Sequence, residues 1–298
     1  MTSLFKLFLL TLVSLQSVDA LQFALPEGNN TVVGDLAFTK IQAGQDLSDI
    51  ARRYDLGFSE VASANPKLNP EHLLLDSVVI IPTQFILPNV KHEGIVVNLP
   101  EMRLYYFQKH DKLVYTYPIG IGRKDWRTPI GRYKIIQKMK DPYWQVPDSI
   151  MAYRIKHGDP VQKIMPPGPT NPLGQFALRL SDPTYLIHGT IEPKGVGREV
   201  SAGCIRLYPE DIKELFSLVP NGTPVRIVDE PVKYGFDAGH LVIEAHPPLP
   251  EDAEDFWANL ADLEKKLVKA NDNAEPLHWN EVIKLAQEAM GIPTALTS

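Results

Sequence analysis

The sequence predicts a mainly β protein with a small β-α-α-β domain near the N-terminus and a helical tail at the C-terminus. Aromatic and β-branched runs dominate residues 94–246, which favours strands. A short strand-helix-helix-strand pattern precedes them over residues 38–82, and charged residues with helical apolar spacing follow residue 251. With 298 residues, of which 44% are hydrophobic and 22% charged, the chain is long enough for two domains and a sizeable core.

The charge balance argues against one class of function. The formal net charge is −6 and the pI is about 5.8. Proteins that coat nucleic-acid phosphates carry an excess of Lys and Arg. We therefore expect no nucleic-acid partner.

The N-terminal segment has the composition of an export signal. Lys6 supplies a positive charge, residues 7–15 form an apolar run, and Val18-Asp19-Ala20 places small or apolar residues where a signal peptidase reads. The sequence therefore predicts a signal peptide over residues 1–20 that is cleaved after Ala20, and the alternative is an uncleaved anchor. Residues 21–35 read as a short polar leader.

Four short elements predict the small N-terminal domain. Alternation predicts a strand at residues 38–41, and apolar residues at i, i+3, i+4 and i+7 predict a helix over residues 47–54. Ser59 is placed to N-cap a second helix, which Asn65-Pro66 ends. A β-branched strand at residues 78–81 closes the unit.

This pattern resembles the LysM module. The resemblance is carried by Gly44-Gln45-Asp46-Leu47-Ser48-Asp49-Ile50-Ala51, Ala64-Asn65-Pro66 and Ile80-Ile81-Pro82. LysM modules bind chitin-like glycans and peptidoglycan. The resemblance therefore implies that residues 37–83 dock on glycan strands that contain N-acetylglucosamine, and the alternative is a small packing domain without a ligand.

The second domain is placed at residues 93–229. The runs that predict its strands lie at residues 95–99, 103–107, 113–117, 133–136, 176–180, 185–187 and 225–228. Residues 109–112 form the expected hairpin turn between the second and third of these strands. One helix is expected from Pro209, because proline is favoured at a helix start, to Asn221-Gly222.

Two further segments complete the chain. Residues 142–171 contain many prolines and glycines, and a loop of that length inside a compact domain is usually functional. The C-terminal extension, residues 230–298, is expected to contain a strand at 241–243 and helices at about 252–270 and 279–290.

Cys204 is the only cysteine of the chain. Export places a protein in an oxidising compartment, where cysteines usually pair, but one cysteine cannot form an internal disulfide. Cys204 is therefore a candidate for a reactive thiol or an intermolecular bond. The structural alternative is a small buried hydrophobe.

The neighbours of Cys204 favour the reactive thiol. His188 ends an expected strand upstream and can serve as a base, and Arg206 adds a permanent positive charge just after the sulfur. Gly189 and Gly203 leave room for backbone near the reacting atoms. Backbone N–H groups around Gly203 and Cys204 can then form an oxyanion hole for a tetrahedral intermediate.

This constellation resembles the L,D-transpeptidases that contain the YkuD catalytic domain. The strongest motif is His188-Gly189-Thr190 with Ser201-Ala202-Gly203-Cys204-Ile205-Arg206-Leu207. Supporting matches are Thr128-Pro129-Ile130-Gly131-Arg132-Tyr133, Pro147-Asp148-Ser149-Ile150 and Asn171-Pro172-Leu173-Gly174. The order of segments is similar to that of periplasmic members from Gram-negative bacteria, of the ErfK/YbiS/YcfS/YnhG-like type. We expect a mixed, β-sandwich-like catalytic domain with one helix after the nucleophile.

The resemblance implies a role for each matching residue. Cys204 would accept the acyl group, and His188 would be its general base and later the acid for the leaving amine. The Gly189 carbonyl would orient the imidazole, and Arg206 would shape the site electrostatically. Ser201 matches the Ser or Thr that precedes the family's cysteine.

One position departs from the family. Ala202 stands where many members carry a second histidine. Any role of that second histidine therefore does not transfer to this chain, while the pair of Cys204 and His188 is unaffected.

The implied reaction is acyl transfer in the periplasm, with no metal and no organic cofactor. Cys204 would attack the carbonyl between an L-centre and the D-alanine of a peptidoglycan stem tetrapeptide, and release D-alanine. The family's acceptors include an amine of another stem and the terminal lysine of an outer-membrane lipoprotein. Two alternatives stay open: a peptidase that uses water as acceptor, and a non-catalytic wall-binding protein in which LysM is the working part.

Two further histidines receive a structural interpretation. His240 and His246 flank an apolar strand, so we expect sheet ends or satisfied surface histidines. They lack clustered acidic or histidine partners in the sequence, and no His-Glu-x-x-His occurs. No zinc site is therefore predicted.

Overall fold

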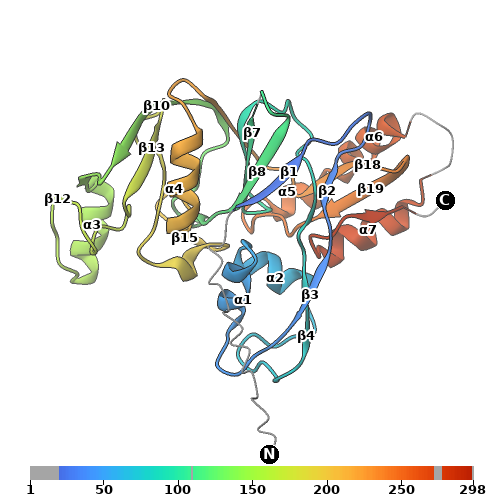
Figure 1. Ribbon diagram of the computed structural model, residues 1–298, viewed down its shortest axis with the longest axis horizontal. Helices are drawn as coiled ribbons and strands as arrows, with labels where there is room; N and C mark the ends of the chain where they lie inside the picture. Colours follow the sequence, from blue (N-terminus) through green and yellow to red (C-terminus); the bar gives the residue numbers. More distant parts are fainter. Residues whose placement is uncertain (1–19, 109, 272–276, 297–298) are drawn as a thin grey trace, which may run out of the picture.

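The computed structural model describes residues 20–108, 110–271 and 277–296 and is mainly β (Figure 1). The predicted fold class is confirmed: strands form the body, and helices dominate the C-terminal segment. Nine strands form the largest sheet, in the spatial order β1 (Leu21–Ala24), β8 (Leu113–Pro118), β7 (Arg103–Gln108), β6 (Gly94–Asn98), β17 (Pro224–Val228), β10 (Gly131–Lys140), β13 (Phe176–Leu180), β14 (Leu186–His188) and β16 (Ile205–Arg206). Of the predicted signal peptide, only Ala20 belongs to the described residues.

The large sheet combines hairpins with returning strands. β6, β7 and β8 pair antiparallel in sequence order, which confirms the predicted hairpin of β7 and β8; residue 109 of its expected turn lies outside the described residues. β17 returns beside β6 in parallel, and β14 and β16 are also parallel. Helix α4 (Pro209–Leu218) packs against this sheet, next to β13 in Figure 1. Its apolar residues join one core with residues of the strands, among them Ile95, Leu104, Tyr117, Ile135, Leu178, Ile187, Ile212 and Leu215.

The small N-terminal domain has the predicted β-α-α-β order. Its elements are β3 (Ala37–Lys40), α1 (Leu47–Arg53), α2 (Phe58–Ala64) and β4 (Val78–Ile81), with β3 and β4 paired antiparallel. Asp46 caps α1 in a reciprocal pair with Asp49. The prediction that Ser59 caps the second helix is wrong, because Gly57 precedes that helix and its N–H donates to the Glu60 carboxylate at 2.5 Å.

The segment expected to be a polar leader is instead part of two sheets. Strand β1 extends the large sheet by pairing with β8. Strand β2 (Val32–Gly34) pairs with β5 (Gln84–Ile86). Leu21 and Phe23 are half-buried while Gln22 and Ala24 are exposed, so a short amphipathic strand precedes the polar residues that suggested a leader.

The segment expected to be a long loop carries secondary structure. Strands β11 (Trp144–Gln145) and β12 (Ile164–Met165) pair at its base, and helix α3 (Asp148–His157) lies between them. No residue of α3 is buried. The apolar periodicity that reveals an amphipathic helix is therefore missing from its sequence.

The C-terminal extension forms a sheet with helices beside it. The helices are α5 (Ala253–Ala258), α6 (Leu260–Ala270) and α7 (Trp279–Glu288), and the strands are β18 (Val232–Asp237), β19 (His240–Ala245) and β20 (Thr294–Ala295). The predicted helix at 252–270 is broken at Asn259. Only one of the three strands was predicted, since β18 is interrupted by polar residues and Gly235.

The remaining short elements lie near the cysteine. They are β9 (Ile121–Gly122), β15 (Glu199–Ser201) and a 3₁₀ turn at Pro193–Gly195. Among the described residues, no helix combines the length and the apolar character needed to cross a membrane.

Candidate active site

His188 ends β14, and Cys204 directly precedes β16, the parallel neighbour of β14. In the pairing of β14 with β16, Ile187 lies opposite Ile205 and His188 lies opposite Arg206. Ile187 and Ile205 belong to the core, and side chains alternate along a strand. His188, Arg206 and Cys204, the residue before β16, therefore share the opposite face, and Cys204 and His188 line one groove.

His188 is held as a neutral base. Its side chain is 3% exposed, and its Nδ1 lies 2.6 Å from the Gly189 carbonyl oxygen. Because a carbonyl only accepts hydrogen bonds, Nδ1 carries the proton and Nε2 keeps a lone pair. Burial, followed by the Arg206 charge, lowers the pKa of His188 to about 3, against the opposing effect of the Gly189 and Leu173 carbonyls.

Cys204 is a thiol rather than a thiolate in this setting. Burial raises its pKa above the ordinary value, although the Leu186 backbone N–H and the Arg206 charge oppose this effect. The sulfur makes a long contact of 3.9 Å with the Thr184 carbonyl oxygen. A neutral thiol needs a neighbouring base to become nucleophilic, and His188 has the protonation state of such a base.

Ser201 holds the turn that carries Cys204. Its buried hydroxyl accepts from the Gly203 N–H at 3.1 Å and donates to the Cys204 carbonyl at 2.5 Å. Gly203 has a φ of +99°, and a Cβ there would lie 2.8 Å from a ring carbon of Tyr185. Glycine is therefore required at this position. The Gly203 N–H already donates to Ser201, so it is not available to an oxyanion. Of the two N–H groups predicted for the oxyanion hole, only that of Cys204 stays a candidate.

Arg206 brings positive charge to the same face. Its side chain is 19% exposed, and its Nη1 lies 3.9 Å from Glu192. Its Nε is buried and has no hydrogen-bond partner among the described residues. A buried guanidinium N–H without a partner is a donor that a ligand carboxylate or carbonyl can use.

The groove around these residues has a volume of about 1310 Å³. Its aromatic lining is supplied by Trp126, Tyr143, Trp144, Tyr153 and Tyr185. Its charged lining consists of Arg123, Arg127, Arg154, Arg179 and Arg206 with Asp125, Asp148 and Asp159. Arginines outnumber aspartates here although the chain as a whole is acidic, but Arg127 is already paired with Glu251 and Asp252, so the positive excess is small.

Helix α3 and the segment around it form one wall of the groove. Trp126 and Tyr153 pack edge to face with ring centroids 5.5 Å apart, and the Arg123 guanidinium lies 4.5 Å from the Trp126 ring. Asn171 is fully buried, and its Nδ2 donates to the Pro142 carbonyl at 2.9 Å. The sequence showed Asn171 only as part of a family motif, and the structure shows that it joins the two ends of this wall.

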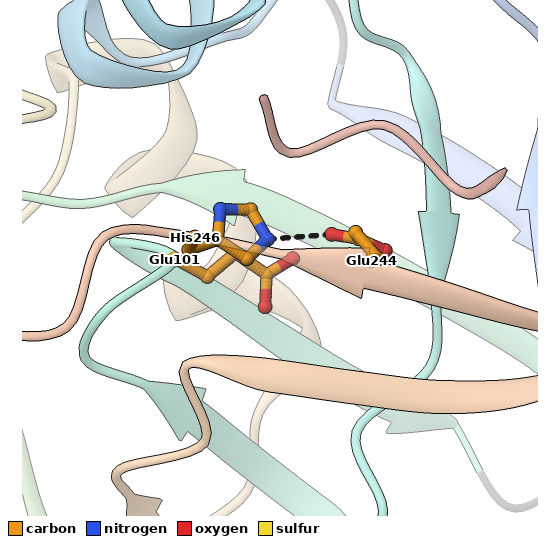
Figure 2. A group of neighbouring side chains, drawn as sticks. All are labelled: Glu101, Glu244 and His246. Carbon is orange, nitrogen blue, oxygen red and sulfur yellow. Dashed lines mark hydrogen bonds and ion pairs between the residues drawn. The ribbon is translucent and has the colours of Figure 1, made fainter. Parts of the chain in front are cut away.

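His246 lies at a sheet end, directly after β19, as predicted, but the alternative of a surface histidine is wrong. His246 is buried, and its Nε2 lies 2.7 Å from the Glu244 carboxylate, with Glu101 in the same cluster (Figure 2). Glu101 is distant from the other two residues in the sequence, so the sequence could not show that the three side chains meet. His240, by contrast, is exposed at the start of β19, as expected.

The cluster of Glu101, Glu244 and His246 also contains a lysine. Lys233 Nζ lies 2.7 Å from Glu101 and 2.9 Å from Glu244, and it donates to the Ile86 carbonyl at 2.7 Å. The ammonium therefore supplies the positive charge that the two carboxylates need. We interpret the cluster as an internal ion-pair network and propose no metal there.

Comparison with known proteins places the chain in a family. The model of the L,D-transpeptidase catalytic domain (YkuD) matches residues 92–227, and the LysM domain model matches residues 39–82. The chain is 38% identical to "Probable L,D-transpeptidase YcfS" of Escherichia coli over 237 residues, which cover 78% of this chain and 74% of the relative. It is 33% identical to "Probable L,D-transpeptidase ErfK/SrfK" of Escherichia coli over 291 residues, or 94% and 92% of the two chains. The chain belongs to the L,D-transpeptidase family and is an enzyme of peptidoglycan transpeptidation.

Solved structures give a weaker likeness. L,D-transpeptidase 3 from Mycobacterium tuberculosis is 16% identical, with a TM-score of 0.34 over 53% of this chain and 77% of that chain. The family assignment rests on the sequence relatives instead.

Proposed function

We propose that this chain is an exported, periplasmic L,D-transpeptidase in which Cys204 carries the acyl group of a peptidoglycan stem tetrapeptide. The observation that carries the proposal is that a neutral, oriented His188 and a protonated Cys204 line the same groove, on one face of the β14–β16 pair. A proton acceptor and a thiol in one groove are what nucleophilic acyl transfer requires.

The proposed first half-reaction conserves atoms and protons. His188 Nε2 takes the Cys204 proton as the sulfur bonds to the carbonyl carbon that precedes D-alanine. The carbon–nitrogen bond then breaks, His188 returns the proton to the leaving amine, and a thioester remains on Cys204. The Gly189 carbonyl orients the ring throughout because it accepts the Nδ1 proton.

In the second half-reaction an amine replaces D-alanine. The acceptor amine attacks the thioester, His188 takes its proton, and the Cys204 thiol is restored. We propose an amine of a second stem or the terminal lysine of an outer-membrane lipoprotein as acceptor. The arginine-rich lining of the groove and the unpartnered Arg206 Nε support binding of a carboxylate-bearing stem.

The N-terminal domain is proposed to hold the enzyme on its polymeric substrate. The LysM match supports docking on glycan strands, and Lys194 at the rim of the catalytic domain reaches Asp46 at 2.6 Å. Export is supported by the composition of residues 1–20 and by relatives of the ErfK and YbiS type.

Incubation of the purified protein with disaccharide-tetrapeptide tests this proposal. We expect free D-alanine and a cross-linked dimer from the wild type, and neither product from Cys204→Ser. Mass spectrometry of the products separates the outcomes: free tripeptide without a dimer indicates a peptidase that uses water. D-alanine release by Cys204→Ser would contradict the proposed nucleophile.

A further inference from the structure

A pair of buried carboxyl groups lies between the LysM unit and the catalytic domain. Asp55 follows helix α1, Asp211 lies in the first turn of α4, and each is 1% exposed. Asp55 Oδ1 and Asp211 Oδ2 are buried, and apart from a hydrogen bond between the two carboxyl groups neither atom has a partner among the residues that the structure describes. Burial raises the pKa of Asp55 to about 7, and burial together with the charge of Asp55 raises the pKa of Asp211.

The cations around this pair are already engaged. Arg103 binds the Glu60 carboxylate at 2.7 Å and donates to the backbone carbonyl of Asp55, not to its carboxylate. Arg52 binds Glu210 at 2.8 Å. The Arg103 charge lowers the pKa of both carboxyl groups, but burial outweighs it, and neither guanidinium is recorded as donating a hydrogen bond to either carboxylate of the pair.

The backbone nitrogen of Leu21 points at this pair. It donates to Asp55 Oδ2 at 2.9 Å, while the nitrogen of Ala20 lies 3.3 Å from Glu214. Leu21 is half-buried and pairs with Thr116 on β8, so the position of its nitrogen is defined by the sheet register. The bond between Ala20 and Leu21 is the one at which the sequence predicts cleavage.

We propose that Asp55, backed by Asp211, is the internal binding site for the free amino terminus that removal of the signal peptide creates at Leu21. Hydrolysis of the Ala20–Leu21 bond consumes one water and leaves a carboxylate on Ala20 and an α-ammonium on Leu21. This ammonium has three donors where the amide had one, and it is smaller than the peptide group that it replaces. Asp55 becomes its anionic partner, and Asp211 retains a proton that it donates to Asp55.

The ion pair would join three segments. Asp55 belongs to the LysM unit, and Asp211 belongs to helix α4, which follows β16. Leu21 belongs to β1, an edge strand of the large sheet. Cleavage would therefore complete the contact between the two domains and anchor β1 on β8. The inference rests on the proposed export and goes beyond the acyl-transfer reaction.

A double-mutant cycle on the full mature chain tests the proposal. Two forms of the protein are compared. The first is purified from the periplasm, and its intact mass establishes that it starts at Leu21. The second is the same chain extended at its N-terminus by Ala20 and three further residues before it. Each form is made with the wild-type Asp55 and with the substitution Asp55→Asn, and thermal unfolding is measured at pH 7. We expect the extension to lower the Tm by roughly 5–10 °C in the wild-type background and to change it little in the Asp55→Asn background.

A second measurement uses only the wild-type mature chain, so it does not depend on the folding of the variants in the cycle. The Leu21 amine, labelled by ¹³C reductive methylation, is titrated by NMR. Its pKa should lie above the ordinary range of about 7.7–8.0. Equal Tm values for the free and extended chains, an equal difference in both backgrounds, an ordinary amine pKa or a mature start other than Leu21 would each overturn the proposal. D-alanine release is assayed on the same samples, so an active enzyme without the coupling refutes this inference and leaves the proposed function intact.

Discussion

Two buried histidines of this chain have contrasting surroundings. His188 lies on the wall of an open groove, where its Nδ1 meets a backbone carbonyl and its neighbour is the cation Arg206. His246 lies in a buried cluster, where its Nε2 meets the Glu244 carboxylate (Figure 2). Lys233 Nζ lies 2.9 Å from the same carboxylate. Both histidine side chains are nearly inaccessible to solvent, so exposure does not distinguish them.

The difference lies in the charge of their partners. Burial and the nearby Arg206 cation lower the pKa of His188 and keep the ring uncharged, against the opposing effect of the Gly189 and Leu173 carbonyls, so one ring nitrogen keeps a lone pair that can take a proton. In the other cluster, burial opposes ionisation of Glu244, but Lys233 and His246 prevail and lower its pKa. We propose that one arrangement prepares a base, whereas the other joins β19 and β18 of the extension to the loop that carries Glu101 and to β5. On this proposal the same residue type serves chemistry in one region and cohesion in the other.

The largest expected effect separates the two histidines by activity. His188→Gln should lower the rate of D-alanine release about 10²–10⁴-fold, because the general base is lost. The matched variant His246→Gln should keep the rate close to that of the wild type. Steady-state assays on folded protein measure both. Comparable losses in the two variants would remove the functional distinction.

The second effect separates them by stability. Lys233→Met should lower the free energy of unfolding by about 3–5 kcal/mol, because Glu101 and Glu244 are left buried without their cation. Urea unfolding measures this change. The control is Lys265→Met, which breaks an exposed pair with Asp262 and should change stability by less than about 1 kcal/mol. Similar values for the two lysines would show that the cluster does not hold the extension.

The third effect is a dependence on pH. The pKa of His188 is about 3 in the folded chain against 6.5 for the unperturbed group. Between these two pH values the unfolded state binds more protons than the folded state. The contribution of His188 to the free energy of unfolding is therefore complete above pH 6.5 and is lost as the pH falls toward 3. The slope attributable to this residue is at most about 1.4 kcal/mol per pH unit. Urea unfolding at several pH values should show a shallower acid slope for His188→Gln, and an unchanged slope would contradict the pKa.

The sequence predicted what depends on neighbouring residues. The strands of the β7–β8 hairpin are aromatic and β-branched runs, which the sequence shows directly. His188 ends β14 and Cys204 directly precedes the adjacent strand β16. Their approach therefore follows from local elements. The six predicted site residues from His188 to Arg206 lie together around the β14–β16 pair, but their roles stay predictions.

The sequence could not show what depends on distant packing. Helix α3 buries none of its residues, so it lacks an apolar stripe. Strand β1 is recognisable only through β8, and Glu101 meets His246 only after the extension folds back. The engagement of the Gly203 N–H by Ser201 depends on a turn with positive φ, which the residue types permit but do not specify.

Trapping of the acyl-enzyme tests directly whether Cys204 is the nucleophile. The reduced wild type and Cys204→Ser are incubated with a carbapenem, which the family resemblance predicts will acylate Cys204, and intact masses are measured before and after digestion. We expect one adduct per chain, located on the peptide that contains Cys204, and none on Cys204→Ser. An unmodified wild type, or an adduct on another residue, would contradict the assignment of Cys204 as the nucleophile.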